Sequence, residues 1–163
     1  MLKRDISFSF IEYENVEELE ENDRELLFTA RAISANAYAP YSKFRVGAAI
    51  RLASNRIVSG VNVENAAFPS GICAERSALS NSVSNFPGDI PVAIAIAASA
   101  TDKFTEEPVP PCGNCRQMLV EEELRNENKI RIILSGKNRI YIIEGVSSLL
   151  PMQFRLENLS LPE

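Results

Sequence analysis

The sequence lacks histidine entirely and holds only three cysteines, Cys73, Cys112 and Cys115, among its 163 residues. Three cysteines cannot all pair within one chain, and their spacing favours metal ligation over a disulfide framework. Thiols kept free for a metal predict a reducing compartment, and we expect the protein to be cytoplasmic.

The sequence also lacks any cluster of basic residues, and its net charge is −5. An acidic chain binds a phosphate backbone poorly, which counts against a polynucleotide substrate and favours a small, uncharged one. The longest apolar run, Val92 to Ala98, is far too short to span a membrane. The first five residues contain no apolar core segment, so we expect no signal peptide.

The cysteines themselves have the spacing of a zinc site. Thiolates are soft ligands for Zn²⁺, and Cys112-Gly113-Asn114-Cys115 can place two sulfurs on one ion, with Cys73 as the third ligand. Because no further ligand of this type remains, the fourth tetrahedral position is open, as in catalytic zinc sites. That position would hold water, whose pKa zinc lowers from about 15.7 to about 7. Glu75, two residues after Cys73, is suited to moving protons there.

Length and composition predict one soluble domain over residues 1–163, since 45% of the residues are hydrophobic and 24% are charged. We expect an N-terminal arm over residues 1–21 and a catalytic core over residues 22–156. In the arm, Ile6, Phe8 and Phe10 alternate with serines, which predicts a short strand.

Periodicity and turn signals predict an α/β fold. We expect Asn22 to cap a helix, with Glu25 completing a capping box, and this helix should end before Pro40. The remaining expected elements are a hairpin of strands 44–52 and 56–63, helices 71–84, 112–126 and 147–150, a buried central strand 91–98, and strands 129–134 and 139–144. The last two strands are separated by only four residues and must be antiparallel. The predicted architecture is a three-layer α/β/α sandwich around a mixed five-stranded sheet.

Four segments of the sequence, taken together, form a more specific pattern than the cysteines alone: Tyr41 to Ala49, Asn62 to Ala66, Cys73 to Arg76, and Pro111 to Gln117. In this order they resemble the small, single-zinc cytidine deaminases that act on free nucleosides, over about residues 30–154. Relatives that act on nucleic acid or nucleotides carry a helix between the last two strands, for which this chain has no room. The resemblance implies the cytidine deaminase fold, one Zn²⁺ per chain, and a homotetramer whose active sites are completed by neighbouring chains.

Several residues gain expected roles from this resemblance. Asn62 and Glu64 follow a strand, and alternation points both side chains the same way, so that they can hold a sugar hydroxyl. An ordinary turn is the alternative, and the family's ribose-binding Asn-x-Glu favours the functional role. The family carries at Phe44 an aromatic ring that packs on the pyrimidine; a core position is the alternative. The backbone of Ala74 and the loop at Pro110 and Pro111 would hold the base.

Three further residues complete the expected site. The resemblance places Ala66 among the substrate contacts. Phe68 stands where the family commonly has a tyrosine that contacts the sugar of a nucleoside held by a neighbouring subunit; it keeps the ring and lacks the hydroxyl. Arg76, one helical turn after Cys73, can donate to the sulfurs and offset the net −1 charge of three thiolates on Zn²⁺. A surface salt bridge is the alternative for Arg76.

Together these features predict a zinc-dependent hydrolase that converts cytidine and deoxycytidine to uridine and deoxyuridine with release of ammonia, in pyrimidine salvage. Two alternatives stay open. One is a deaminase of another cytosine-like aminated compound on the same scaffold. The other is a non-catalytic, zinc-stabilised binding protein, against which the intact Glu75 argues.

Overall fold

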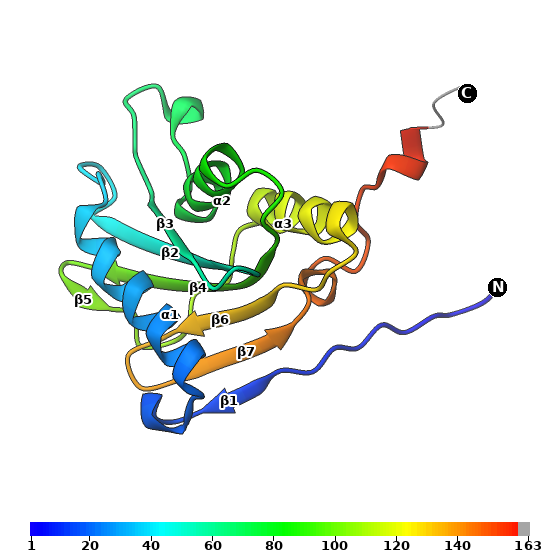
Figure 1. Ribbon diagram of the computed structural model, residues 1–163, viewed down its shortest axis with the longest axis horizontal. Coiled ribbons are helices and arrows are strands. Elements are labelled where there is room, and N and C mark those ends of the chain that lie inside the picture. The colour runs from blue at the N-terminus through cyan, green and yellow to red at the C-terminus, as the bar shows by residue number, and fades with distance from the viewer. Residues whose placement is uncertain (160–163) are drawn as a thin grey trace.

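The structure, a computed structural model, describes residues 1–159 and consists of a seven-stranded sheet between two helical layers (Figure 1). The strand order is β1-β7-β6-β4-β2-β3, and β5 pairs with the end of β4. In chain order the strands are β1 Ile11–Tyr13, β2 Phe44–Leu52, β3 Ile57–Val61, β4 Pro91–Ala100, β5 Lys103–Phe104, β6 Arg131–Ser135 and β7 Ile140–Glu144.

Strand β4 is the centre of the sheet, as its apolar run predicts. It pairs antiparallel with β2 and parallel with β6, so the sheet is mixed. Its side chains alternate between two cores: Ile94 and Ile96 face one helical layer, whereas Ala95 and Ala97 face the other. Because both faces are covered, nearly every position in this strand is apolar.

Helix α1, Glu21–Ile33, covers the face of the sheet that carries the alanines of β4, whereas α2, Ala74–Asn85, and α3, Gly113–Asn126, cover the opposite face (Figure 1). Two glycines allow this close packing. A Cβ atom on Gly47 would lie 2.2 Å from the Ala30 carbonyl oxygen of α1, and one on Gly60 would lie 2.3 Å from the Ala78 amide nitrogen of α2. The predicted three-layer sandwich is confirmed.

The expected hairpin, the central strand and the two long helices on the far face are confirmed, with ends that differ by a few residues. The last two strands are antiparallel, as expected. The terminal helix predicted over residues 147–150 is instead a 3₁₀ helix over Val146–Leu149.

The prediction of five strands is wrong, because β1 and β5 are added. Strand β5 forms a tight hairpin with β4 through Thr101 and Asp102, whose φ angles of 49° and 62° suit a two-residue turn. Strand β1 lies later in the arm than predicted, at Ile11–Tyr13 instead of Ile6 to Phe10. The register pairs Ile11 with Ile142, Glu12 with Tyr141 and Tyr13 with Ile140 of its partner β7, which ends at Glu144.

The predicted helix is found, but the predicted cap at Asn22 is wrong, because Asn22 lies within the first turn. Helix α1 begins at Glu21, and the preceding Glu20 makes no side-chain capping bond. The capping box forms earlier, where Asn15 and Glu18 bracket a short 3₁₀ helix and the Asn15 amide donates to Glu18 Oε1 at 3.1 Å. The same sequence pattern occurs twice within ten residues, and only the first copy is used.

No helix within residues 1–159 is long and apolar enough to cross a lipid bilayer. The predicted single domain runs to residue 163, and residues 160–163 lie outside the described part of the chain.

Candidate metal centre and active-site cavity

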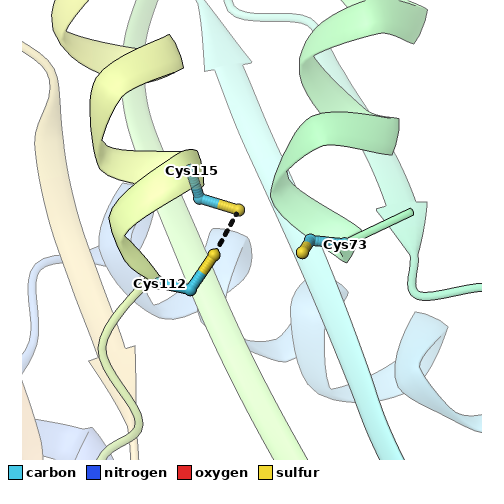
Figure 2. Close-up of side chains that lie close together, drawn as sticks. All are labelled: Cys73, Cys112 and Cys115. Atoms are coloured by element: carbon cyan, nitrogen blue, oxygen red, sulfur yellow. Dashed lines mark hydrogen bonds between the residues drawn. The ribbon is translucent and has the colours of Figure 1, made fainter. Parts of the chain in front are cut away.

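Two helix starts bring the three cysteines together. Cys73 immediately precedes α2, Cys112 immediately precedes α3, and Cys115 lies in the first turn of α3. Their three Sγ atoms lie within 4.8 Å of one another, and those of Cys112 and Cys115 are 3.5 Å apart (Figure 2). The predicted grouping of the three cysteines is therefore found, although Cys73 lies some 40 positions before the other two in the sequence.

This cluster fits a zinc ion. Sulfurs on a tetrahedral zinc lie roughly 3.8 Å apart, given a Zn–S bond of about 2.3 Å. Arg76 adds a second observation, because its Nε is buried without a hydrogen-bond partner among the residues described. Buried donors are rarely left unpaired, and thiolates gathered on a cation would provide the missing acceptor. No ion pair of Arg76 occurs in the described chain, so the alternative of a surface salt bridge has no support.

The electrostatics of the cluster differ from one thiol to the next. Burial raises the pKa of the Cys73 and Cys115 thiols, and the nearby Glu75 carboxylate raises both further. For Cys112, burial is outweighed by hydrogen bonds from the Cys115 amide and the neighbouring thiols, so that its pKa is lowered. Two of the three thiols thus resist ionisation unless a cation compensates their charge, and metal binding must displace protons.

Glu75 is the second residue of α2, is only 6% exposed, and lines the same cavity as Cys73 and Cys112. Burial raises the pKa of its carboxyl above the usual range. Its carboxylate does not belong to the group of mutually close ligand atoms. It therefore lies beside the candidate metal centre as a carboxyl group suited to accepting and returning protons.

An open cavity of about 870 Å³ extends from the cysteines to the surface. Most of the predicted substrate residues line it: Phe44, Asn62, Glu64, Phe68, Ala74 and Glu75. Pro110, from the loop expected to hold the base, also lines it. Ala66 does not; it is exposed and lies outside the cavity lining.

Sequence reasoning missed several residues of this cavity. Ile72, Ile96 and Val109 give it an apolar wall, which no motif indicates. Tyr41, for which the sequence favoured no functional role, packs edge-on against Phe68 with ring centroids 5.9 Å apart. The inclusion of Tyr41 in the first motif segment is the signal that could have found it.

Asn62 and Glu64 reach the cavity through fixed contacts with the chain around Phe44. The side-chain amide of Asn62 donates to the Phe44 carbonyl at 2.9 Å and accepts from the Val46 amide at 2.7 Å. Glu64 Oε2 accepts from the backbone amides of Tyr41 and Ser42 at 2.9 and 3.3 Å. Hydrogen bonding, with the Ser42 hydroxyl first, holds the pKa of Glu64 below its usual value.

Comparison with known proteins assigns the family. The cytidine and deoxycytidylate deaminase zinc-binding region matches residues 20–127, which include all three cysteines and Glu75. The chain belongs to this deaminase family. It is 36% identical to a cytidine deaminase of Halalkalibacterium halodurans over 148 residues, 85% of this chain and 98% of that protein. It is 35% identical to a cytidine deaminase of Sporosarcina psychrophila over 143 residues, 83% of this chain and 93% of that one.

A solved structure agrees with this assignment to the deaminase family. The crystal structure of a cytidine deaminase from Burkholderia pseudomallei superposes with a TM-score of 0.69 at 34% identity, covering 80% of this chain and 97% of that chain. The deaminase-like fold predicted from the sequence is therefore confirmed.

Proposed function

We propose that the protein is a zinc-dependent cytidine deaminase that hydrolyses cytidine and deoxycytidine to the uracil nucleosides and ammonia. The observation that carries this proposal is a buried carboxyl group, Glu75, beside three clustered thiols and within an open cavity of about 870 Å³. Relatives of this chain that are named cytidine deaminase support the same activity.

Cys73, Cys112 and Cys115 would hold one Zn²⁺ per chain, and Arg76 would donate to their sulfurs. Bound zinc supplies Lewis-acid activation of water at neutral pH. Glu75 would take a proton from the attacking water and deliver it to ring N3, then take the second proton from the hydroxyl group formed at C4 and deliver it to the departing amine, which leaves as ammonia. Because burial favours the protonated carboxyl, Glu75 is suited to holding the proton between these transfers.

The substrate would lie in the cavity with its base next to the cysteines. Phe44 would pack on the pyrimidine, and the backbone of Ala74 with the loop at Pro110 would hold its polar edge. Asn62 and Glu64 would receive the sugar from the 3′ side, which is why deoxycytidine should also be accepted. Phe68, 76% exposed at the cavity rim, would contact a sugar without donating a hydrogen bond. We retain Ala66 as a proposed contact through its backbone, although it lies outside the cavity lining.

We further infer a homotetramer in which neighbouring chains complete the active sites, and a role in pyrimidine salvage. The exposed ring of Phe68 at the rim is consistent with a partner chain at this edge. The cysteines are free thiols, which supports a reducing, cytoplasmic location. We propose residues 22–156 as the catalytic core, preceded by the arm.

A substrate panel tests the proposal. Zinc-loaded protein is offered cytidine, deoxycytidine, cytosine, cytidine 5′-monophosphate and a single-stranded oligonucleotide, and ammonia release is measured. We expect turnover of the two nucleosides and little of the oligonucleotide, because the chain is acidic, with a net charge of −5. Deamination of the oligonucleotide at a rate comparable with that of cytidine, or no turnover of either nucleoside, would contradict the proposal.

A further inference from the structure

The turn before β2 holds the carboxylate of Glu64 from several sides. The amides of Tyr41 and Ser42 donate to Oε2 at 2.9 and 3.3 Å, and the Ser42 hydroxyl donates to Oε1. A carboxylate offers about four lone-pair sites. Three donors therefore leave roughly one site free, on Oε1, which is the oxygen that Ser42 holds.

The Ser42 hydroxyl has a second contact, because it accepts from the Phe44 amide at 3.0 Å. The bond passes over Lys43, which has φ of 57°, a conformation that few residues other than glycine adopt. The carbonyl of Phe44 is bonded in turn by Asn62 at 2.9 Å. One hydroxyl thus connects the two cavity residues to which we assign the base and the sugar.

We propose that Ser42 is a positioning residue that orients Glu64 toward a hydroxyl group on the sugar, and so sets the preference for nucleosides that carry a 3′-hydroxyl. This inference rests on the proposed function. A glutamate side chain that is free to rotate loses rotamer entropy when it binds a ligand, whereas one held in advance does not. Without the Ser42 hydroxyl, Oε1 loses its only donor within the described chain, whereas the backbone amides of Tyr41 and Ser42 still hold Oε2, so that Oε1 can rotate out of line with the sugar.

The test compares cytidine with 2′,3′-dideoxycytidine, which lacks the 2′- and 3′-hydroxyls of the sugar and keeps the 5′-hydroxyl. In Ser42→Ala, the ratio of kcat/KM for cytidine to that for dideoxycytidine should fall roughly three- to tenfold, the range expected for one hydrogen bond. A disturbance of the Phe44 ring affects the base of both nucleosides alike and cancels in the ratio, which therefore reports on the sugar contacts of Glu64 and of Asn62, whose amide is bonded to the Phe44 carbonyl. Ser42→Thr keeps a hydroxyl and should restore the ratio.

Ser54 provides a matched control. Its amide donates to Asp89 at 3.1 Å and its hydroxyl donates to the same carboxylate, so the arrangement repeats that of Ser42 and Glu64. Ser54 is exposed and does not line the cavity. Ser54→Ala should therefore change thermal stability about as much as Ser42→Ala does, while leaving the substrate ratio at the wild-type value.

The possible failures are distinguishable. An active wild-type protein whose substrate ratio is unchanged in Ser42→Ala would overturn the inference alone, as would an equal fall in Ser54→Ala. A zinc-loaded wild-type protein that deaminates neither nucleoside would overturn the proposed function and this inference with it.

Discussion

Glu75 combines a titratable carboxyl group with almost complete burial, at 6% exposure. Such a side chain is costly to the fold unless it is neutral or compensated, because desolvation penalises the ionised form. Helix α2 begins one residue earlier, at Ala74, so that the amide groups of its first turn lie close by. Burial raises the pKa of this carboxyl group above its usual value and so moves it toward neutral pH, where general acid–base catalysis is most effective.

Glu75→Gln tests this role directly. Glutamine keeps the size of the side chain and removes the titrating group, so zinc content and melting temperature should be retained. Turnover of cytidine should fall by at least roughly 10²- to 10⁴-fold, because one carboxyl group serves several proton transfers. Zinc analysis, thermal denaturation and ammonia release on one preparation measure all three quantities.

Two results would contradict the assignment of Glu75. Near-normal turnover in the variant would show that another group moves the protons. Loss of zinc would show that Glu75 is itself a ligand or supports the cysteine ligands. If it is a ligand, the fourth position that three thiolates leave open would not be free for water.

For single residues, the sequence predicts the candidate metal ligands and the proton-transfer group better than it predicts which side chains contact one another. Cys73, Glu75 and the Cys112–Cys115 pair follow from residue type and local spacing. Ser42 does not, because its bond to Glu64 spans 22 positions and depends on how the turn meets the end of β3. Ala66 was expected in the cavity on motif membership alone, and the structure places it outside the lining.

Cys73 and Glu75 lie at the start of helix α2, so the distance between α2 and the sheet determines their positions. Gly60 on β3 is in contact with α2 at Ala78, one turn beyond Cys73 and Glu75. The backbone of Ala74 also approaches this glycine, with its oxygen 2.8 Å from an added Cβ. Backbone atoms cannot rotate aside as a flexible side chain can, so any added atom must move the helix.

Gly60→Ala should therefore destabilise the protein by about 1–3 kcal/mol, the usual cost of overpacking a core. Urea unfolding followed by circular dichroism measures this loss. The neighbouring Ser59→Ala is the control, since the half-buried Ser59 should change the free energy of unfolding by less than about 0.5 kcal/mol. Equal stability of the two variants would mean that α2 can shift without cost.

Element prediction succeeded where the signals are local and long. The hairpin of β2 and β3 shows β-type residues on both sides of a Ser54-Asn55 turn, and Asn55 adopts φ of 68° there. Strands β1 and β5 have only three and two residues, too few for alternation to be visible. Each of them forms because a longer strand offers it hydrogen bonds, β7 for β1 and β4 for β5. The residues of so short a strand do not indicate which longer strand it will pair with.

For the molecule as a whole, the candidate metal centre lies between two parts of the chain. Cys73 precedes α2, which packs on the β2–β3 hairpin, whereas Cys112 and Cys115 lie on the crossover between the parallel strands β4 and β6. An ion bound to all three would therefore stabilise the contact between α2 and α3 in addition to its own ligands.

Metal removal should lower stability accordingly. At a zinc concentration about a thousandfold above Kd, binding stabilises the fold by about 4 kcal/mol. For a chain of this size, a chelator should then lower Tm by roughly 10 °C. Zinc should be released more easily as the pH falls, because the raised pKa values of the Cys73 and Cys115 thiols let protons compete with zinc for the sulfurs.

The control for metal removal is a Cys73→Ala, Cys112→Ala double variant. Its Tm should already be low and should not respond to the chelator. Full zinc occupancy in this variant, measured by atomic absorption, would contradict the proposed ligands.

The pairing of β1 with β7 has a consequence for the order of events during translation. Ile11 lies opposite Ile142, so β1 leaves the ribosome about 130 residues before its neighbour β7 does. At roughly 5–20 residues per second, β1 waits on the order of ten seconds with its backbone hydrogen-bonding groups unpaired. Each of the other strands in residues 1–159 has a partner made closer to it in time, so β1 is the strand most open to chaperones until β7 has been made.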